Sequence, residues 1–531
     1  MTSSWTQDLR LGAPIAPIQT DLCILGTGPV GLILASGAAN RGLSVTLLEV
    51  GGSNATIGAE SLDVHFDRRP YRGATIGRAL GLGGTSNLWG GQLLPVRPAD
   101  LLARPQIAAA AWPITYAEIE PYFGALQAML DIRSGGFDFG SMRATSHGLS
   151  SLDFTDWTPR LSKWLAFGKR NMVAALKDPL KEQAGVRVWL NANVDGWHVS
   201  EASGKRRVRE LVATSPEGES LRVQPRAVVI AGGALESARS ILEFNAQARP
   251  LSAGIDELAG RYLHDHLSLR IARVHIHDLG AFEDRFAPFF EGPTMRSLRM
   301  ELPANTLESE LLPALYAHFV AVAPDNSGFA VVRDCLRSLQ RRDLRLASAS
   351  AMRVPRALPG ITKVIYTKVV KKRLAFPVGS EIYLNVDLEQ TPRYENRVYL
   401  GAAYGGARQP MHIDWDVTED APRIASSVRR YFERFWAQNS LGRIASLEFL
   451  DFHGGAHAWN DNVYDLYHPA GTTRMASDPA HGVVDANLKV HGTSNAYIAG
   501  SSVFPSMGAA NPTFTAMALA LRLARYIDQT R

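Results

Sequence analysis

Three glycines near the N-terminus have the spacing of a turn that binds a nucleotide. They stand as Gly26-x-Gly28-x-x-Gly31, directly after a short apolar run. In this pattern the first glycine makes a tight turn, the second lets the backbone approach a pyrophosphate, and the third lets a helix pack closely on a strand. Pro29 and Val30, inside the pattern, bring the N-terminus of the next helix toward the phosphates.

A carboxylate at Glu49 closes the next apolar run, 18 residues after Gly31. At this place a carboxylate can accept hydrogen bonds from both ribose hydroxyls of an adenosine, and its charge would repel a 2′-phosphate, which disfavours NADP. The alternative is a solvated glutamate at the end of a strand. FAD and NAD are equally compatible with this motif, and because the glycine pattern occurs once, a flavin enzyme built on it should take electrons from its substrate.

The elements around the glycine turn predict a βαβ unit. A strand over residues 21–25 leads into the turn, a helix follows over 32–41 and stops at Gly42, and a second strand covers 44–48. Later segments show the same pattern of short apolar strands and helices, and they predict a domain that is discontinuous in sequence. These later strands and helices are expected at residues 186–199, 207–214, 227–231, 235–244, 496–499 and 513–528.

A second sheet is expected in the remaining part of the chain. Apolar and polar residues alternate at 269–275, 382–388 and 397–400, which is typical of half-buried strands. This alternation predicts a second sheet that is largely antiparallel.

Further segments of the chain resemble the glucose–methanol–choline (GMC) oxidoreductase family, closest in motif layout to its pyranose oxidase and cholesterol oxidase branches. The segments that carry the resemblance are residues 83–91, Gly-Gly-Thr-Ser-Asn-Leu-Trp-Gly-Gly; 191–194, Asn-Ala-Asn-Val; 231–237, Ala-Gly-Gly-Ala-Leu-Glu-Ser; 468–472, His-Pro-Ala-Gly-Thr; 500–505, Gly-Ser-Ser-Val-Phe-Pro; and 511–515, Asn-Pro-Thr-Phe-Thr. The match is weaker between residues 278 and 376.

The resemblance implies an FAD site that adds many contacts to the glycine turn and Glu49. The implied contacts are Gly84, Thr85, Asn87, Leu88, Gly90, Gly91, Val194, Ala231, Gly232, Ser237, Gly500, Ser501, Asn511, Pro512 and Thr513. Pyranose oxidases attach the flavin through a histidine in the glycine-rich loop, and Leu88 stands at the equivalent place here. A leucine cannot form that bond, so the FAD should be non-covalent.

The resemblance also implies the predicted fold class, which is α/β (α+β overall). A Rossmann-type FAD-binding domain would consist of residues 1–100, 180–267 and 455–531, with a cap or linking segment at 101–179. Residues 268–454 would form the substrate-binding domain around the antiparallel sheet.

Carried over residue by residue, the resemblance implies that His468 and Asn511 face the reactive edge of the flavin. Alcohol oxidation needs a base for the hydroxyl proton while the hydride leaves the carbon, and a histidine with an ordinary pKa near 6.5 is largely neutral at pH 7. Asn511 would donate its amide to the same oxygen. The alternatives are a surface-loop histidine at 468 and a helix-capping role for Asn511, which can coexist with catalysis.

The triplet His264, Asp265 and His266 has residue types that bind metals. In this family context we expect it to anchor the strand that enters the second domain, and no metal site is predicted. Cys23 and Cys335 are far apart in the sequence, so no disulfide is predicted either.

The composition is that of an ordinary globular protein, with 46% hydrophobic and 20% charged residues. No apolar run approaches the roughly 20 residues of a membrane helix. The first 20 residues show no export signal, so we expect a cytoplasmic protein.

The net charge of +5 is unevenly distributed. Between Arg333 and Arg373 there are twelve Lys or Arg residues and only two acidic ones. Without interleaved aromatics or a nucleic-acid-binding module, this segment is expected to be a solvated, partly helical surface rather than a nucleic-acid site. Peripheral contact with a membrane is the lesser alternative.

The resemblance favours a sugar or glycoside as the substrate, oxidised at a secondary hydroxyl to a ketone. Polar residues of the second domain also suit hydroxyl groups, whereas a steroid pocket would be mainly apolar. These residues are Glu389, Gln390, Arg393, Tyr394 and Asn396, and the alternative is that they are solvated strand ends.

Other functions stay open at this stage. They are oxidation of an aliphatic, aromatic or steroid alcohol, a redox-neutral flavoprotein lyase, and a flavin-binding partner protein, against which the presence of His468 and Asn511 argues. The motifs leave the electron acceptor open among oxygen, a quinone or another molecule.

The leucine at position 88 gives a direct test of flavin attachment. Acid precipitation of the purified yellow protein should leave the flavin colour in the supernatant, because denaturation releases a cofactor held by non-covalent contacts. Colour that stays in the washed pellet would contradict this prediction.

Overall fold

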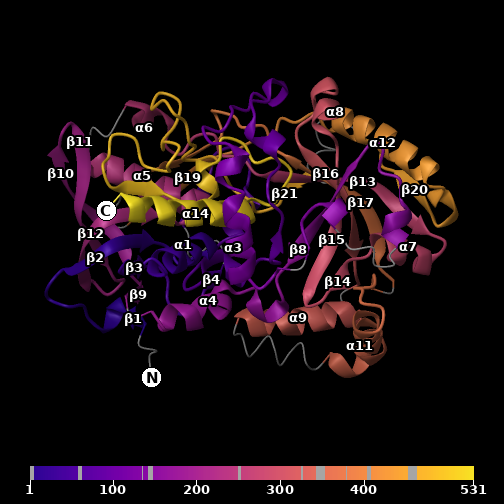
Figure 1. The fold of residues 1–531 in the computed structure, drawn as a ribbon, viewed down its shortest axis with the longest axis horizontal. Coiled ribbons are helices and arrows are strands. Elements are labelled where there is room, and N and C mark those ends of the chain that lie inside the picture. The colour runs from indigo at the N-terminus through magenta and orange to yellow at the C-terminus, as the bar shows by residue number, and fades with distance from the viewer. Residues whose placement is uncertain are drawn as a thin grey trace.

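The computed structural model describes residues 5–57, 63–133, 135–141, 148–183, 185–248, 253–324, 327–341, 353–377, 379–402, 408–452 and 463–530. Its elements form two large sheets, which lie at opposite ends of the long axis (Figure 1). Within the described ranges, no helix combines the length and apolar character that crossing a bilayer requires.

The first sheet contains the predicted βαβ unit. Strand β2 (Ile18–Leu25), helix α1 (Pro29–Ala39) and strand β3 (Val45–Leu48) follow one another, and β2 and β3 pair in parallel. The other strands are β1 (Thr6–Asp8), β9 (Val186–Leu190), β10 (Asn193–Ala202), β11 (Lys205–Thr214), β12 (Ser220–Ile230) and β22 (Ala496–Ile498). The strand order is β1-β9-β3-β2-β12-β11-β10, with β22 paired to β12.

The C-terminal segment returns to this sheet as predicted. Strand β22 pairs in parallel with β12, which itself pairs in parallel with β2. Helix α14 (Pro512–Gln529) packs on α1 so closely that a Cβ on Gly37 would lie 2.9 Å from the side chain of Leu521. Figure 1 shows the yellow α14 beside the indigo α1. The nucleotide domain is therefore built from both ends of the chain.

The second sheet is antiparallel throughout its described strands. Their order is β20 (Ala445–Phe449), β13 (His266–Ile276), β17 (Glu381–Glu389), β16 (Leu315–Val322), β15 (Thr294–Glu301), β8 (Thr158–Trp164) and β7 (Gln92–Leu93), with β14 (Phe289–Glu291) paired to β15 and β21 (Val463–Asp465) paired to β13. This agrees with the predicted antiparallel sheet.

The two faces of the second sheet differ in polarity. Leu269, Val386 and Phe319 lie on an apolar face, and the Phe319 ring contacts rings of Phe282 in α7 (Leu279–Phe286) and Phe432 in α12 (Ala421–Gln438). Because side chains alternate along a strand, the neighbouring residues point the other way. That second face is polar, although most of its residues are buried; it includes Ser268, Arg299, Tyr316, His318, Asn385 and Asp387.

Residues 397–400 lie elsewhere than predicted. They form β18 (Arg397–Leu400), which pairs with β19 (Met411–Asp414) in a separate three-stranded sheet completed by β5 (Val64–Phe66). The strand prediction was right, but its place in the large antiparallel sheet was wrong, because β18 pairs with the nearby four-residue strand β19, and β19 pairs with the short, distant strand β5, which leaves no periodic pattern in the sequence. A two-stranded ribbon, β4 (Thr56–Ile57) and β6 (Ala79–Leu80), completes the described strands.

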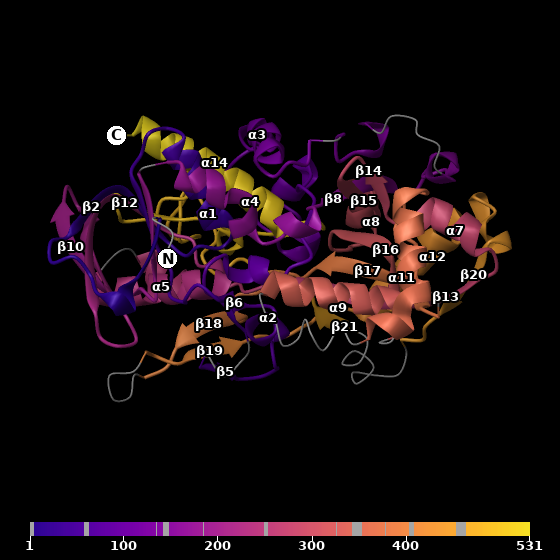
Figure 2. The same cartoon turned by 90° about the horizontal axis from the view of Figure 1, so that it is seen from below.

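Helices cover both sheets. The helices not yet given are α2 (Arg72–Thr75), α3 (Pro121–Met129), α4 (Met172–Lys181), α5 (Gly233–Ala248), α6 (Ala253–Leu258), α8 (Ala304–Ser309), α9 (Gly328–Arg341) and α11 (Val354–Val369). Helix α4 packs on α1, and α3 packs on α14. Helices α9 and α11 lie on the outside of the second sheet and face the viewer in Figure 2.

Candidate active site

The glycine turn joins β2 to α1, as its spacing predicted. Gly26 has a φ of 108°, and a Cβ there would lie 2.7 Å from the carbonyl oxygen of Ala231. A Cβ on Gly31 would lie 2.2 Å from the carbonyl oxygen of Gly26. Backbone packing therefore requires glycine at both positions.

Gly28 has a different reason to be glycine. Its φ is −67° and its ψ is −179°, which any residue can adopt, and no protein atom lies within 4 Å of an added Cβ. Gly28 is also the N-cap of α1, without a side-chain cap. The protein itself leaves this space free at a helix N-terminus, where an anionic pyrophosphate binds favourably. The turn therefore fits the phosphates of FAD.

Glu49 holds together the loops around this turn. Its carboxylate is buried and accepts four hydrogen bonds: from the backbone N–H and hydroxyl of Thr27 at 3.0 and 2.6 Å, and from the N–H groups of Gly51 and Gly81 at 3.0 Å each. Burial raises the pKa of Glu49, whereas these hydrogen bonds lower it. From the sequence, only a contact of Glu49 with the ribose was predicted, and this structural role was not.

The loop at residues 83–91 spans the distance between the two sheets. A Cβ on Gly84 would lie 3.0 Å from the Cα of Gly28, and one on Gly90 would lie 2.9 Å from the ring of Trp164 in β8. The amide of Asn87 donates to the carbonyl oxygens of Leu82 and Gly84 at 3.2 and 2.7 Å, which stabilises the loop.

Other residues of the predicted FAD site also lie near the turn. Ala231 and Gly232 follow β12, and the N–H of Ala231 donates to Leu25 at 2.8 Å. Ser237 is buried in α5, and its hydroxyl has no protein partner. Val194 is the second residue of β10 and lies two positions after Ala192, whose N–H donates to the backbone oxygen of Glu49. The unpartnered hydroxyl of Ser237 is consistent with a polar ligand.

The C-terminal motifs meet in a second set of contacts. Ser501, which follows Gly500, donates its hydroxyl to the carbonyl oxygen of Pro469 at 2.6 Å. Asn511 is the N-cap residue of α14, and Pro512 and Thr513 are its first residues. The Asn511 side chain makes no capping hydrogen bond; instead its Nδ2 lies 3.3 Å from Nε2 of His468. The predicted catalytic pair is therefore brought together, and the capping alternative for the side chain is wrong.

The triplet at residues 264–266 holds the turn that carries His468. His264 exchanges backbone hydrogen bonds with Ala470, and the Asp265 carboxylate accepts from the N–H groups of His266 and His468 at 2.7 and 2.8 Å. The hydroxyl of Tyr71 also hydrogen-bonds to Asp265. In the part of the chain that the structure describes, no group of three or more His, Cys, Asp or Glu is arranged to hold a metal ion.

The ring of His266 sets the protonation pattern of His468. A carbonyl oxygen only accepts, so Nε2 of His266 must donate to Gly508 O at 2.7 Å. In a neutral ring, Nδ1 of His266 is then an acceptor. It lies 3.2 Å from Nδ1 of His468, which must therefore carry the proton. The lone pair of His468 is thereby left on Nε2, beside Asn511.

Both rings are held neutral by their surroundings. Burial lowers the pKa of His266, and burial together with the nearby His266 lowers the pKa of His468 to about 3. His266 was recognised in the sequence only as an anchor. The strand register that places β21 beside β13 brings it to His468, and that register is not visible in the sequence.

The carbonyl that accepts from His266 is itself fixed. Glu389 accepts hydrogen bonds from the N–H groups of Met507 and Gly508 at 2.6 and 3.0 Å, and Arg104 pairs with the same carboxylate. Gly508 has a φ of 65°, and a Cβ there would lie 2.4 Å from Asp100. The turn before Asn511 is therefore rigidly placed.

The five polar residues expected to suit substrate hydroxyls are used elsewhere. Glu389 anchors the turn at residues 507–508, while Gln390 and Asn396 donate to the carbonyl oxygen of Asp416 at 2.8 and 3.0 Å. Arg393 pairs with Glu395, and Tyr394 lies under the guanidinium of Arg261. Glu389 therefore supports the turn next to the predicted catalytic pair, and the other four residues make contacts with other parts of the protein.

The polar groups near His468 come from the face of the second sheet instead. His318 pairs with Asp387 at 3.0 Å, and Asn385 donates to Ser268 at 3.2 Å. The side-chain oxygen of Asn385 is buried without a protein partner. The Asp387 carboxylate also interacts with the hydroxyls of Ser268 and Tyr316, and its charge acts on His468. Two surface hollows, of about 670 and 500 Å³, are lined by other residues and include neither His468 nor Asn511.

Comparison with known proteins agrees with these motifs. Residues 392–520, which include His468 and Asn511, match the family model described as GMC oxidoreductase. The 6'''-hydroxyparomomycin C oxidase of Streptomyces lividus is 24% identical and aligns with 96% of this chain and 91% of its own length. The fructose dehydrogenase large subunit of Gluconobacter japonicus is 23% identical over 65% of this chain and 54% of its own length. A formate oxidase structure from Aspergillus oryzae shares the fold, with a TM-score of 0.56 and 14% identity over 97% of this chain and 99% of its own.

The free space at Gly28 can be tested directly. Gly28→Ala should fold as stably as the wild type but bind FAD at least about tenfold more weakly, because the methyl group would occupy the place of the pyrophosphate and overpacking of this kind costs about 1–3 kcal/mol. Fluorescence titration of apoprotein with FAD measures this. The matched control is Gly124→Ala, at an exposed position of α3 where an added Cβ also has no protein atom within 4 Å. Equal FAD affinity of the two variants would refute pyrophosphate binding at Gly28.

Proposed function

We propose, from the premise that the chain belongs to the GMC oxidoreductase family of FAD-dependent enzymes acting on CH–OH groups, that it oxidises a sugar or glycoside at a secondary hydroxyl to a ketone. The observation that carries this proposal is the lone pair of His468 Nε2, held beside the Asn511 amide. FAD supplies the hydride acceptor when it is bound.

His468 acts as the base in this proposal. Its Nδ1 proton is held by His266, so Nε2 is free to accept the hydroxyl proton of the substrate. The lowered pKa keeps the ring neutral at physiological pH, which means that no proton has to leave His468 before the reaction.

Asn511 positions the hydroxyl that reacts. Its Nδ2 group lies 3.3 Å from His468 Nε2, so an oxygen bound between them would donate to the histidine and accept from the amide. The amide would also stabilise negative charge on that oxygen. Its own Oδ1 is buried without a protein partner, which supports a role toward a bound ligand.

The FAD would be held non-covalently by the residues predicted from the sequence. The pyrophosphate would lie at the turn around Gly28, and the loop containing Leu88 would run along the flavin. Glu49 would face the ribose in addition to its four protein contacts. The predicted domain bounds and a cytoplasmic location stay predictions.

A carbohydrate is the substrate class that the surroundings of the base favour. A substrate hydroxyl group can donate to the unpartnered side-chain oxygen of Asn385, beside the buried Asp387 carboxylate, whereas an aliphatic, aromatic or steroid alcohol would leave the Asn385 oxygen unpaired. The names of two relatives, an oxidase of an aminoglycoside and a fructose dehydrogenase, support the same class. A redox-neutral lyase is less well supported, because neither name describes a lyase.

The base can be tested by mutation and by pH. His468→Ala should bind FAD but undergo flavin reduction by substrate at least about a hundredfold more slowly, from the usual magnitude of general-base catalysis. In the wild type, the reduction rate should stay constant as the pH falls from 8 to 5, because a base with a pKa of about 3 remains deprotonated throughout.

The pH profile distinguishes a base whose pKa is lowered by burial from a histidine with the ordinary pKa. A base with the ordinary pKa near 6.5 would lose about thirtyfold in rate at pH 5. His275→Ala, on the exposed part of β13, is the control and should reduce its flavin normally. A wild-type profile with a midpoint near 6.5, or normal reduction by His468→Ala, would exclude the proposed state of the base.

The substrate class can be tested by anaerobic stopped-flow reduction. Sugars or glycosides should bleach the oxidised flavin absorbance faster than simple aliphatic or aromatic alcohols, and the product should be a ketone by mass and NMR analysis. Asp387→Asn should raise KM for the best sugar more than it lowers kcat, since it changes a binding contact. Rapid bleaching by simple alcohols alone would show that the carbohydrate assignment is wrong.

A further inference from the structure

Helix α11 turns apolar side chains toward solvent. Leu358, Ile365, Tyr366, Val369 and Val370 at its outer side and end are 51, 57, 54, 59 and 61% exposed. Large apolar groups gathered at this density on one surface mark a contact site. Helix α11 lies at the lower edge of the molecule in Figure 1 and faces the viewer in Figure 2.

The exposed apolar residues lie on one side of the helix. Leu358, Ile365 and Val369 are spaced by seven and four residues, which puts them on a single line along a helix with 3.6 residues per turn. Thr367, on the opposite side of the helix, is buried. A Cβ on Gly328 of α9 would lie 2.4 Å from the backbone of Gly360, so the two helices are tightly packed. The apolar line is thus held outward by a fixed support.

Lysines surround the apolar line. By the helical period, Lys368 lies about a quarter-turn to one side and Lys363 about a third of a turn to the other. Lys371 and Lys372 follow at the exposed end of the helix. No acidic residue occurs between Asp343 and Glu381. The surface is therefore apolar at its centre and positively charged at its rim.

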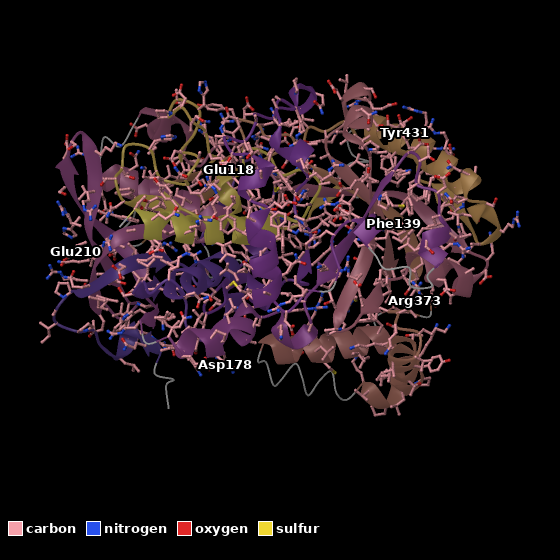
Figure 3. All side chains as sticks on the ribbon, viewed as in Figure 1. Glu118, Phe139, Asp178, Glu210, Arg373 and Tyr431 are labelled. Atoms are coloured by element: carbon pink, nitrogen blue, oxygen red, sulfur yellow. The ribbon has the colours of Figure 1, made fainter. Side chains whose placement is uncertain are left out.

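Arg373 does not belong to this surface. Its guanidinium is buried and donates to the carbonyl oxygens of Glu283 and Asp284 at 2.9 and 2.6 Å, and Figure 3 shows it at the junction of α7 and α11. It fixes the end of α11, so the exposed charges of this surface are those of the lysines. Of these, Lys363 and Lys371 also act on the Glu283 carboxylate, and Lys368 lies 5.3 Å from the centre of the Phe290 ring.

Charge decides which partner fits. A second copy of the chain would bring the same lysines face to face, and the segment 342–352 carries Arg342 and Arg345 against one acidic residue, so neither complements the rim. Nucleic acid would match the charge but offers no apolar interior for Ile365 and Val369. An anionic lipid layer offers both, with headgroups for the lysines and acyl chains for the apolar line.

We propose that the α11 surface, defined as Leu358, Ile365, Tyr366, Val369 and Val370 with Lys363, Lys368, Lys371 and Lys372, docks the protein on an anionic membrane. The helix lies in the plane of the interface. This surface lies apart from His468 and its partners in the contacts described above, so binding needs no change in the catalytic pair.

Vesicle co-sedimentation of the FAD-loaded protein tests this inference. Binding to phosphatidylglycerol–phosphatidylcholine vesicles should exceed binding to phosphatidylcholine vesicles by at least about tenfold, and 0.5 M salt should abolish the difference. Ile365→Glu with Val369→Glu, and separately Lys368→Glu with Lys371→Glu, should each lower binding by about tenfold or more. FAD content and thermal midpoint confirm folding of each variant.

The matched control is Leu11→Glu with Ile15→Glu, which changes two apolar residues that are 81 and 102% exposed elsewhere. It should bind vesicles like the wild type. Equal binding to both vesicle types, or unchanged binding of the Ile365→Glu and Val369→Glu variant, overturns the inference. Concentration-dependent dimers in sedimentation velocity that disappear in this variant would also overturn it, in favour of a second copy.

Discussion

The hydrogen bond between the rings of His266 and His468 is the interaction on which the site depends. His266 belongs to β13 of the second sheet, His468 lies in the turn after β21, and Asn511 begins the helix that packs on α1 of the nucleotide domain. The lone pair on His468 Nε2, the proposed base, is therefore defined by contacts that come from both sheets. A shift of one ångström between them would lengthen these contacts beyond hydrogen-bond range. This explains why the turn at residues 507–508 is fixed by Glu389, Asp100 and Arg104 at once.

Buried carboxylates hold backbone turns in place in both halves of the molecule. Glu49 accepts hydrogen bonds from N–H groups of three loops at the nucleotide turn, and Glu389 accepts hydrogen bonds from two N–H groups of the turn before Asn511. An isolated buried carboxylate is strongly unfavourable, and such a group is tolerated because several donors, or a partner such as Arg104, compensate for lost water. Function is thus supported by groups that need not touch a substrate.

Local patterns in the sequence predicted the parts of the fold that neighbouring residues determine. The βαβ unit and the return of residues 496–528 follow from local patterns of strands, helices and turns, whereas the pairing of His468 with Asn511 was expected only from the family resemblance. Pairings between distant strands could not be predicted, since the sheet that contains Arg397–Leu400 is completed by a three-residue strand at Val64–Phe66, and the contact of His266 with His468 depends on register. Polar residues such as Gln390 and Asn396 could not be assigned to support or to substrate from their types alone.

The residues that hold the turns and the polar residues of the second sheet have different roles, and this difference affects how the substrate preference of such an enzyme can change. The proposed base and its amide partner lie on turns after β21 and before α14, whereas polar side chains such as Ser268 of β13, His318 of β16 and Asn385 of β17 project from a regular surface. Exchanges at these positions, unlike exchanges at His266 or Glu389, alter the pattern of donors and acceptors without changing the contacts that hold the turns. Related enzymes can therefore acquire new substrate preferences while inheriting one unchanged reaction, and a designer could follow the same route.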